Sequence, residues 1–300
     1  MSRLPSPILV TGASGLLGTA IVLRLTADGA HIDGLSNRTP FPGTHTLDLE
    51  APEAMARVAA LPWEAIVHCA AFRSPDFCEL EPVRARLLNA LVPERLATLA
   101  AERGAPLVHI STDYVFDGTH PPYRETDAPH PINTYGATKL EAEQRVQAAH
   151  PGAAILRVPA LYGQPPAPIP SPLVDDAVRN ARDPAAPPQD DVIVRFPTHV
   201  ADVARVAAWL LEWRLAGIFH ASAPTPCTRY TFTCEVSQLL MGSSAHIPRS
   251  DFDPQRKAPR PVNCQLATAK LAAAGGPVPR GYRDYLPGIL REHERRSGAV

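Results

Sequence analysis

Short apolar runs alternate with longer segments of helical periodicity through the first half of the chain, as expected for a parallel sheet wrapped by helices. The apolar runs predict five buried strands: Pro7–Thr11, Ala30–Leu35, Ala65–Cys69, Pro106–Thr112 and Ala153–Val158. Helices are predicted between them, among them Gly15–Asp28, Pro75–Arg103 with potential breaks at Pro82 and Pro93, and Thr134–Ala149. Because βαβ crossovers are right-handed, this order predicts an α/β fold with a doubly wound parallel sheet, whose ligands contact the carboxyl ends of the strands.

The regular alternation ends after Val158. Residues Gln164–Asp191 contain eight prolines around one short helical candidate, a composition that favours a lid or substrate loop over a core element. A disordered surface segment is the alternative. Beyond it, the pattern predicts strands at Val192–Phe196 and Gly217–His220, and helices at Val200–Trp213, Arg229–Met241 and Gln265–Ala274.

Composition and charge narrow the classes of function. The chain has 300 residues, 45% of them hydrophobic, and its 29 basic and 30 acidic residues leave a net charge of −1. This balance gives no attraction to polyanions, so neither a nucleic acid nor a membrane is expected as the main partner. Because no apolar run approaches the roughly 18 to 20 residues that span a bilayer and the start lacks a signal-peptide core, we expect a cytoplasmic protein. Five cysteines without a C-x-x-C pair indicate neither a disulfide framework nor a zinc site.

The strongest local motif is the sequence TGASGLLG at Thr11–Gly18, between an apolar strand and an alanine-rich helix. Glycines at this place let the backbone approach a pyrophosphate, whose charge then lies at the N-terminus of the helix. A G-x-x-G-x-x-G spacing is expected by chance only about 0.07 times in such a chain. The motif therefore predicts a dinucleotide site, and a glycine-rich turn that serves helix packing alone is the alternative.

The loop after the second strand indicates which dinucleotide binds. At Ser36-Asn37-Arg38 it carries a cation and no acid. An arginine at this position can meet a 2′-phosphate, whereas a carboxylate would bind the free ribose hydroxyl of NAD. The sequence therefore favours NADP. Asp33 is the competing acid, but it lies inside the strand and is more simply a polar strand residue; Arg38 could also be a solvated loop arginine.

A second motif places Tyr135 and Lys139 four residues apart, on one face of a predicted helix. A phenol titrates near pH 10 in isolation, and a neighbouring ammonium favours the phenolate, which suits proton transfer near neutrality. Three of the 29 basic residues are lysines, so a Y-x-x-x-K match is expected by chance about 0.07 times. The motif predicts a catalytic pair, with an exposed helix pair as the alternative.

Thr112 closes the strand that precedes this helix. Its hydroxyl should lie at the carboxyl end of the sheet, where it could hold a carbonyl oxygen beside the Tyr135 phenol, whereas Ser111 should point the opposite way. The remaining candidates are interpreted structurally. Four histidines in or beside strands lack metal-ligand spacing and are expected to be structural: His68, His109, His199 and His220. The adjacent loop acids Asp190 and Asp191 are expected to be solvated. The C-terminal arginines are expected to end a helix: Arg291, Arg295 and Arg296. No metal is predicted.

Taken together, these motifs resemble those of the extended short-chain dehydrogenase/reductase family. They comprise the glycine motif, STDYVFDG at Ser111–Gly118, PYRETD at Pro122–Asp127, and Tyr135–Lys139. Within the family, the chain is similar to dTDP-4-dehydrorhamnose reductases and to the regulatory beta subunit of methionine adenosyltransferase. The second similarity is carried most clearly by RFPTHV at Arg195–Val200 and by Arg260-Pro261 followed by Asn263.

The resemblance implies roles for individual residues. Thr112, Tyr135 and Lys139 would form the catalytic triad, with Lys139 also holding the nicotinamide ribose, and Tyr114 and Arg260 would face the substrate. The residues implied at NADP, together with those expected from the motifs above, are Gly12, Ser14, Gly15, Leu16, Leu17, Gly18, Asn37, Arg38, Asp48, Leu49, Cys69, Ala70, Ala71, Asn89, Tyr135, Lys139 and Pro159. Two departures concern the substrate: Ala160 stands where the rhamnose enzymes usually carry a tryptophan, and the asparagine-phenylalanine pair that often follows is absent.

The resemblance also implies an organisation and a reaction. Residues 1–163 would form an NADP-binding Rossmann domain and residues 164–300 mainly a substrate lobe, with 192–220 returning to the first domain. The expected reaction is NADPH-dependent reduction of a nucleotide-linked 4-keto-6-deoxy sugar, with Tyr135 as proton donor. The alternative is an NADP-binding regulatory partner of another enzyme, so the expected partners are a small-molecule substrate and a second copy of the chain or a partner enzyme.

Overall fold

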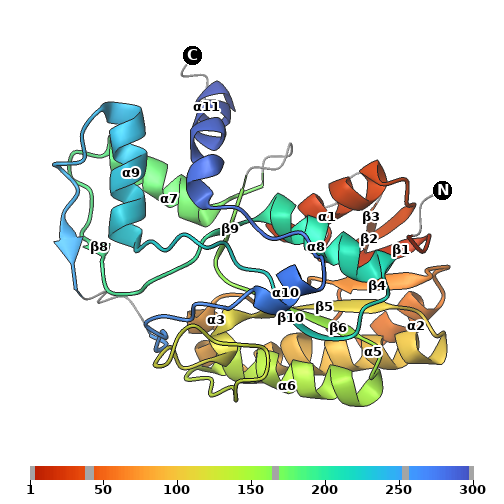
Figure 1. The fold of residues 1–300 in the computed structure, drawn as a ribbon. Coiled ribbons are helices and arrows are strands. Elements are labelled where there is room, and N and C mark those ends of the chain that lie inside the picture. The colour runs from red at the N-terminus through yellow and green to blue at the C-terminus, as the bar shows by residue number, and fades with distance from the viewer. Residues whose placement is uncertain (1–3, 38–43, 164–168, 252–256, 297–300) are drawn as a thin grey trace.

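A seven-stranded parallel sheet forms the centre of the computed structural model, which describes residues 4–37, 44–163, 169–251 and 257–296 (Figure 1). The strand order is β10-β6-β5-β4-β1-β2-β3, so the chain starts in the middle of the sheet and winds outward in both directions. The strands are β1 (Ile8–Thr11), β2 (Ile32–Ser36), β3 (Thr44–Thr46), β4 (Ala65–His68), β5 (Leu107–Thr112), β6 (Ala154–Val158) and β10 (Gly217–His220). The predicted doubly wound fold is confirmed.

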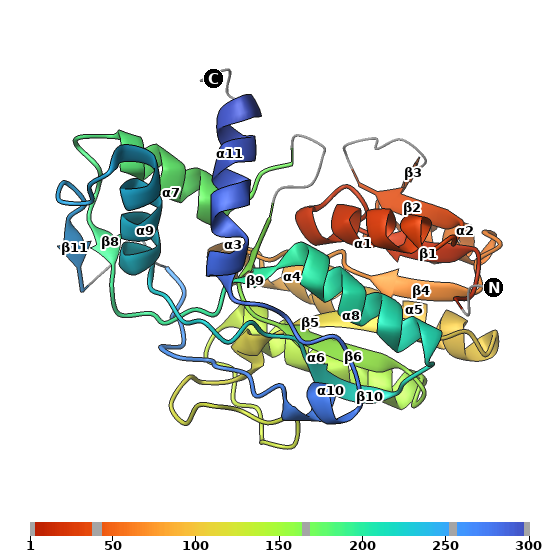
Figure 2. The same ribbon diagram turned by 45° about the horizontal axis from the view of Figure 1, so that its top comes forward.

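Helices cover both faces of this sheet (Figure 2). On one face lie α1 (Leu16–Ala27) and α8 (Val200–Glu212), which bury their aliphatic side chains against alternate strand positions such as Val10 and Val67. On the other face lie α2 (Ala54–Ala59), α5 (Val92–Glu102) and α6 (Thr134–Ala149), packed on the opposite set, such as Leu9 and Ile66. Near-continuous apolar strands follow from this burial on both faces.

The predicted helix at Pro75–Arg103 is divided into four segments: α3 (Pro75–Leu80), α4 (Pro82–Arg86), a π-helical turn (Leu87–Leu91) and α5. Pro82 starts α4, where its missing N–H costs nothing, and Pro93 lies in the first turn of α5. The chain turns between α3 and α4 at Glu81, the residue that precedes Pro82.

The second half builds a smaller lobe beside the carboxyl ends of the strands (Figure 1). Its core joins α7 (Pro172–Arg182), α9 (Arg229–Met241) and α11 (Leu286–Arg296) around Tyr162, Phe232 and Tyr282. Short strands β7 (Leu161–Tyr162) with β9 (Thr198–His199), and β8 (Gln189–Asp190) with β11 (Arg249–Ser250), complete it.

Three expectations for this half are wrong. The proline-rich segment is not a free lid, because α7 within it buries Val174, Ala177 and Val178 in the lobe core. Residues 192–196 form no strand; Val194 and Arg195 make isolated bridges instead. The helix expected at Gln265–Ala274 is reduced to α10 (Ala269–Ala273). The prolines around α7 suggested a loop, but the helix forms because its apolar face packs into the lobe core.

Candidate functional site

The glycine loop joins β1 to α1 through very close backbone contacts. Gly12 has a φ of +66°, and a Cβ at this residue would lie 3.0 Å from the backbone nitrogen of Ala70. A Cβ on Gly18 would lie 2.1 Å from the Gly12 carbonyl oxygen, so both positions require glycine. Gly15, the N-cap of α1, has no side chain to cover the first-turn N–H groups of the helix. These groups can bind an anion, as the sequence motif predicts.

A buried hydroxyl fixes the loop that follows β4. Backbone N–H groups of Cys69 and Ala70 donate to Thr11 Oγ1 at 3.1 and 3.2 Å, and the same oxygen lies 2.7 Å from His68 Nδ1. Because Thr11 already accepts two hydrogen bonds, its own proton goes to His68 Nδ1. Burial lowers the pKa of His68 to about 3, helped by the nearby ammonium of Lys139, so the imidazole is neutral. The carboxyl ends of β1 and β4 are thereby tied together.

Asn89 is buried and hydrogen-bonds the loop that follows β4. Its Oδ1 accepts from the Phe72 backbone nitrogen at 2.8 Å, and its Nδ2 donates to the Phe72 carbonyl oxygen at 3.0 Å and to Thr138 Oγ1 at 3.3 Å. The side chain therefore ties the π-helical turn to helix α6. These contacts give Asn89 a structural reason for its place in the site.

The Thr112 and Tyr135 hydroxyls lie together at the end of β5. Asn133 caps α6 by accepting from the Gly136 backbone nitrogen at 2.8 Å, which sets Tyr135 in the first turn of the helix. Burial raises the pKa of Tyr135 above that of a free phenol, and a hydrogen bond from Thr112 opposes the rise. The predicted lowering of the Tyr135 pKa is wrong for this arrangement, because burial is the largest influence on the phenol and raises its pKa. A protonated phenol is the form that can donate a proton.

Lys139 lies one turn further along α6 and is 2% exposed. Its Nζ donates to the Ile110 carbonyl oxygen at 2.7 Å and lies 3.1 Å from His109 Nε2. Burial lowers the pKa of Lys139 to about 8, although Glu143 raises it in part. The ammonium is therefore held against the sheet, and its protonation is poised near neutral pH.

Two arginines, Arg195 and Arg260, lie close to Tyr114, which follows β5. Arg260 Nη2 pairs with Asp76 Oδ2 of α3 at 2.8 Å, and the Asp76 carboxylate also accepts the backbone N–H groups of Lys257 and Ala258. Burial raises the pKa of the Tyr114 phenol, and the charges of both Arg195 and Arg260 oppose this rise. Tyr114 and Arg260, the two residues expected at the substrate, are thus brought close enough to interact electrostatically.

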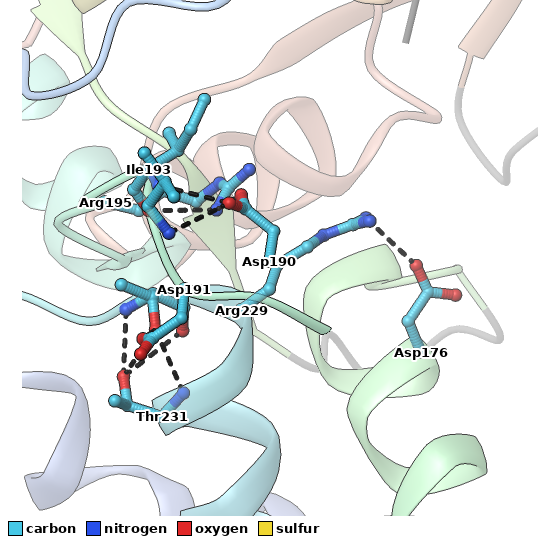
Figure 3. Close-up of polar contacts among 9 residues, drawn as sticks. Asp176, Asp190, Asp191, Ile193, Arg195, Arg229 and Thr231 are labelled. Carbon is cyan, nitrogen blue, oxygen red and sulfur yellow. Dashed lines mark hydrogen bonds and ion pairs between the residues drawn. The ribbon is translucent and has the colours of Figure 1, made fainter. Parts of the chain in front are cut away.

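Arg195 is a site residue that no role was predicted for, although the RFPTHV sequence that contains it was noted. Burial raises the pKa of Asp113 to about 7, and the Arg195 charge acts against this increase. Figure 3 shows how the segment is held: Asp190 Oδ2 lies 3.5 Å from Arg195 Nη1, and Asp190 Oδ1 accepts from the backbone nitrogen of Ile193. Arg195 therefore reaches the site through a folded turn.

The expectation that Asp190 and Asp191 are solvated is also wrong. Asp190 is 5% exposed, and Asp191 accepts a hydrogen bond from Thr228 Oγ1 at 2.6 Å, beside Thr231 at the start of α9 (Figure 3). Arg249 Nε adds an ion pair to Asp191 at 2.8 Å. Both carboxylates organise the small lobe.

Four of the predicted cofactor contacts belong to the adenine side of the dinucleotide site. Arg38 lies outside the described residues, and Asn37 is exposed just after β2. Asp48 is exposed and accepts from the Glu50 backbone nitrogen, whereas Leu49 is buried. The other residues predicted at the cofactor are distributed over three loops and one helix: Ser14 and Gly15 at the loop surface, Leu16 and Leu17 buried in α1, Cys69 and Ala71 after β4, and Pro159 after β6.

The described residues contain neither a metal-site arrangement nor a membrane-spanning helix. Within them, no group of three or more histidine, cysteine or acidic side chains is arranged to hold a metal ion. No helix in these ranges has the length and apolarity needed to cross a membrane.

Comparison with known proteins identifies the family. The profile of the RmlD substrate binding domain matches residues 6–295. The chain belongs to the RmlD substrate binding domain family. It is 40% identical to methionine adenosyltransferase 2 subunit beta of Xenopus tropicalis over 275 residues, which cover 89% of this chain and 82% of the relative. The extended short-chain dehydrogenase/reductase resemblance is confirmed.

Solved structures of dTDP-4-dehydrorhamnose reductases share the same fold. A dTDP-4-dehydrorhamnose reductase from Clostridium acetobutylicum is 28% identical with a TM-score of 0.83, covering 96% of this chain and 99% of that one. The dTDP-4-dehydrorhamnose reductase of Bacillus anthracis, solved in complex with NADP, is 26% identical with a TM-score of 0.82, covering 95% and 97%. The chain is thus similar both to proteins named as dTDP-4-dehydrorhamnose reductases and to proteins named as a subunit of methionine adenosyltransferase 2.

Proposed function

We propose that this protein is an NADPH-dependent reductase of a nucleotide-linked 4-keto-6-deoxy sugar. The observation that carries the proposal is that Thr112 contacts Tyr135 at the carboxyl end of β5, while Lys139, one turn further along α6, donates to Ile110 of the same strand. The neighbouring strand β4 leads into the loop that touches Gly12. This arrangement places a proton donor next to the glycine loop that would bind a dinucleotide, and carbonyl reduction needs both. The NADP-bound structure of a reductase with the same fold supports the cofactor.

The glycine loop between β1 and α1 fits a dinucleotide. Gly12 and Gly18 leave no room for a side chain, so the backbone of the loop can approach a pyrophosphate, and the first turn of α1 offers it N–H groups. NADPH supplies a hydride when it is bound. Within residues 1–163, the other cofactor contacts predicted from the sequence would line the path from this loop toward Lys139, and the lobe built mainly from 164–300 would hold the sugar nucleotide.

Each member of the triad then has a distinct task. The Tyr135 phenol, kept protonated by burial, donates its proton to the sugar oxygen as the carbonyl is reduced. The Thr112 hydroxyl, beside the phenol, turns its single proton toward that oxygen and holds it. The Lys139 ammonium binds the nicotinamide ribose and stabilises the tyrosinate that remains after proton transfer.

Arg195 and Arg260, whose charges act on Tyr114 beside the triad, favour a diphosphate-linked substrate. We expect Arg195→Met to raise the KM for the sugar nucleotide by about 10- to 150-fold, because a charge-assisted hydrogen bond contributes about 1.5 to 3 kcal/mol. The value of kcat should change much less, and steady-state kinetics separate the two. Arg229→Met is the matched control, since Arg229 pairs with Asp176 in the small lobe. An unchanged KM in Arg195→Met would remove Arg195 from substrate binding.

Cofactor choice gives a second test. The wild-type protein should bind NADPH more tightly than NADH, and Arg38→Ala should lose much of this preference, since a contact to the 2′-phosphate contributes on the order of 1.5 to 3 kcal/mol. Isothermal titration calorimetry with both dinucleotides measures it, with Arg57→Ala as a control on α2. Equal affinity of the wild type for NADPH and NADH would contradict the assignment.

A regulatory role is the second candidate, and the 40% identity to a protein named as a beta subunit favours it. In that case the chain binds NADP and a partner enzyme and turns over no sugar. The deciding experiment incubates the purified protein with NADPH and a panel of nucleotide-linked keto sugars and follows absorbance of NADPH. Oxidation that depends on one sugar supports the reductase. Tight NADPH binding without turnover, together with altered kinetics of a methionine adenosyltransferase on addition of the chain, supports the regulator.

A further inference from the structure

A row of three polar side chains crosses the sheet beneath helix α6. Thr11 of β1 is the in-register neighbour of His68 of β4, and His68 is the neighbour of His109 of β5. The two imidazole rings stack with their centroids 5.4 Å apart and 19° between their planes. Neither ring is more than 1% exposed. Two histidines are therefore enclosed on the sheet face that carries Lys139.

The hydrogen bonds of His109 define its protonation. Burial lowers the pKa of His109 well below its usual value, and the nearby Lys139 charge lowers it further. A neutral imidazole has one bare nitrogen, and the nitrogen next to the ammonium is Nε2, at 3.1 Å from Lys139 Nζ. The proton of His109 is then on Nδ1, which has no hydrogen-bond partner among the described residues. His109 thus leaves a buried N–H unpaired in order to present a lone pair to Lys139.

The ammonium of Lys139 has three N–H groups to place. One is donated to the Ile110 carbonyl oxygen and a second to His109 Nε2, which leaves a third for a ligand. The other ionisable groups around it are Glu143 on α6, together with Cys69 and His68 at the end of β4. Glu143 is itself held in a buried ion pair with Arg157 of β6 at 2.7 Å, so it is not a direct partner of the ammonium.

We propose that His109 is a positioning residue for Lys139: its bare Nε2 accepts a hydrogen bond from the ammonium, holds the ammonium against β5 and directs the remaining N–H to the bound dinucleotide. The structure contains the contact between His109 and Lys139. The effect of this contact on NADPH binding rests on the proposed function. His109 acts through Lys139 and is not a catalytic residue itself.

A change of His109 should therefore appear in the titration of Lys139. A hydrogen bond accepted from the charged form of a group favours that form, so its loss lowers the pKa of an ammonium. His109→Leu keeps a side chain of similar size without an acceptor, and the pKa of Lys139, about 8 in the wild type, should fall by about one unit. His109→Gln places an amide oxygen near the position of Nε2 and should restore most of the wild-type value. His109→Asn places its oxygen near Nδ1 instead and should behave like His109→Leu.

The scarcity of lysine makes this measurement direct. The chain contains three lysines, Lys139, Lys257 and Lys270, so protein labelled with ¹³C at the lysine ε-carbons gives few side-chain signals, which Lys257→Arg and Lys270→Arg assign. The pH titration of the Lys139 signal is followed in the apo protein, wild type and His109 variants alike. His150→Leu is the control, because His150 contacts the Ala105 carbonyl at the far end of α6. A Lys139 signal that titrates at the same pH in His109→Leu or His109→Asn as in the wild type overturns the inference.

NADPH affinity measured against pH separates this inference from the proposed function. Wild-type affinity should fall as the pH rises through the pKa of Lys139, and in His109→Leu the fall should occur at lower pH by the same shift. If NADPH binds but its affinity falls at the same pH in His109→Leu as in the wild type, His109 does not position Lys139 for the dinucleotide. If the wild type binds no NADPH at any pH, the proposed function fails, whereas the lysine titration still decides the contact with His109.

Discussion

Tyr135→Phe is expected to reduce turnover about 100- to 10,000-fold while NADPH affinity changes little. The substitution removes the phenolic proton but keeps the ring, which packs edge-on to Tyr114 with centroids 5.9 Å apart. Burial keeps the phenol protonated in the wild type, whereas phenylalanine has no hydroxyl and cannot donate a proton. Turnover is measured with the keto sugar identified in the panel, and affinity by calorimetry.

Lys139→Met provides the contrast for this prediction. Turnover and NADPH affinity should fall together, because the ammonium is proposed to act on both the tyrosinate and the nicotinamide ribose. Tyr230→Phe, the same chemical change on α9 in the small lobe, serves as the control and should leave both quantities unchanged. Near wild-type turnover in Tyr135→Phe would show that the triad is wrongly assigned.

Arg157→Met should lower the free energy of unfolding by about 3 to 5 kcal/mol, since it removes one partner of a buried ion pair and leaves the other charge unpaired. Arg157 Nη2 lies 2.7 Å from Glu143 Oε2, and both side chains are 2% exposed. Ser111 Oγ also donates to Glu143, and the Arg157 guanidinium lies 5.0 Å from the Phe116 ring centroid. The pair joins β5, β6 and α6 directly behind the triad.

Urea denaturation followed by circular dichroism measures this effect. The double variant Arg157→Met/Glu143→Leu should recover most of the lost stability, because no unpaired charge remains in the core. Arg145→Met is the matched control: its ion pairs to Glu94 and Glu141 are about one-third exposed, and their loss should cost about 1 kcal/mol or less. A loss of similar size in Arg145→Met and Arg157→Met would contradict the argument from burial.

Local patterns were sufficient for much of the fold and for the core of the site. A strand followed by TGASGLLG and an amphipathic helix specifies its own turn, because Gly12 and Gly18 are needed wherever the backbone closes that tightly. Tyr135 and Lys139 share a helix face by their spacing alone. The same reasoning failed at α7, where prolines before and after the helix suggested a loop and concealed the apolar face of Val174, Ala177 and Val178.

The sequence by itself thus determined the doubly wound sheet, the tight glycine loop, the candidate triad and the family, since each depends on residues within one or two turns or strands of each other. The tertiary structure alone decided which groups surround the triad. His109 meets Lys139 across 30 positions, and Arg195 reaches Asp113 from the far half of the chain. Burial then reversed the expected shift of the Tyr135 pKa. Desolvation and long-range pairing depend on how distant segments pack, and no local spacing encodes them.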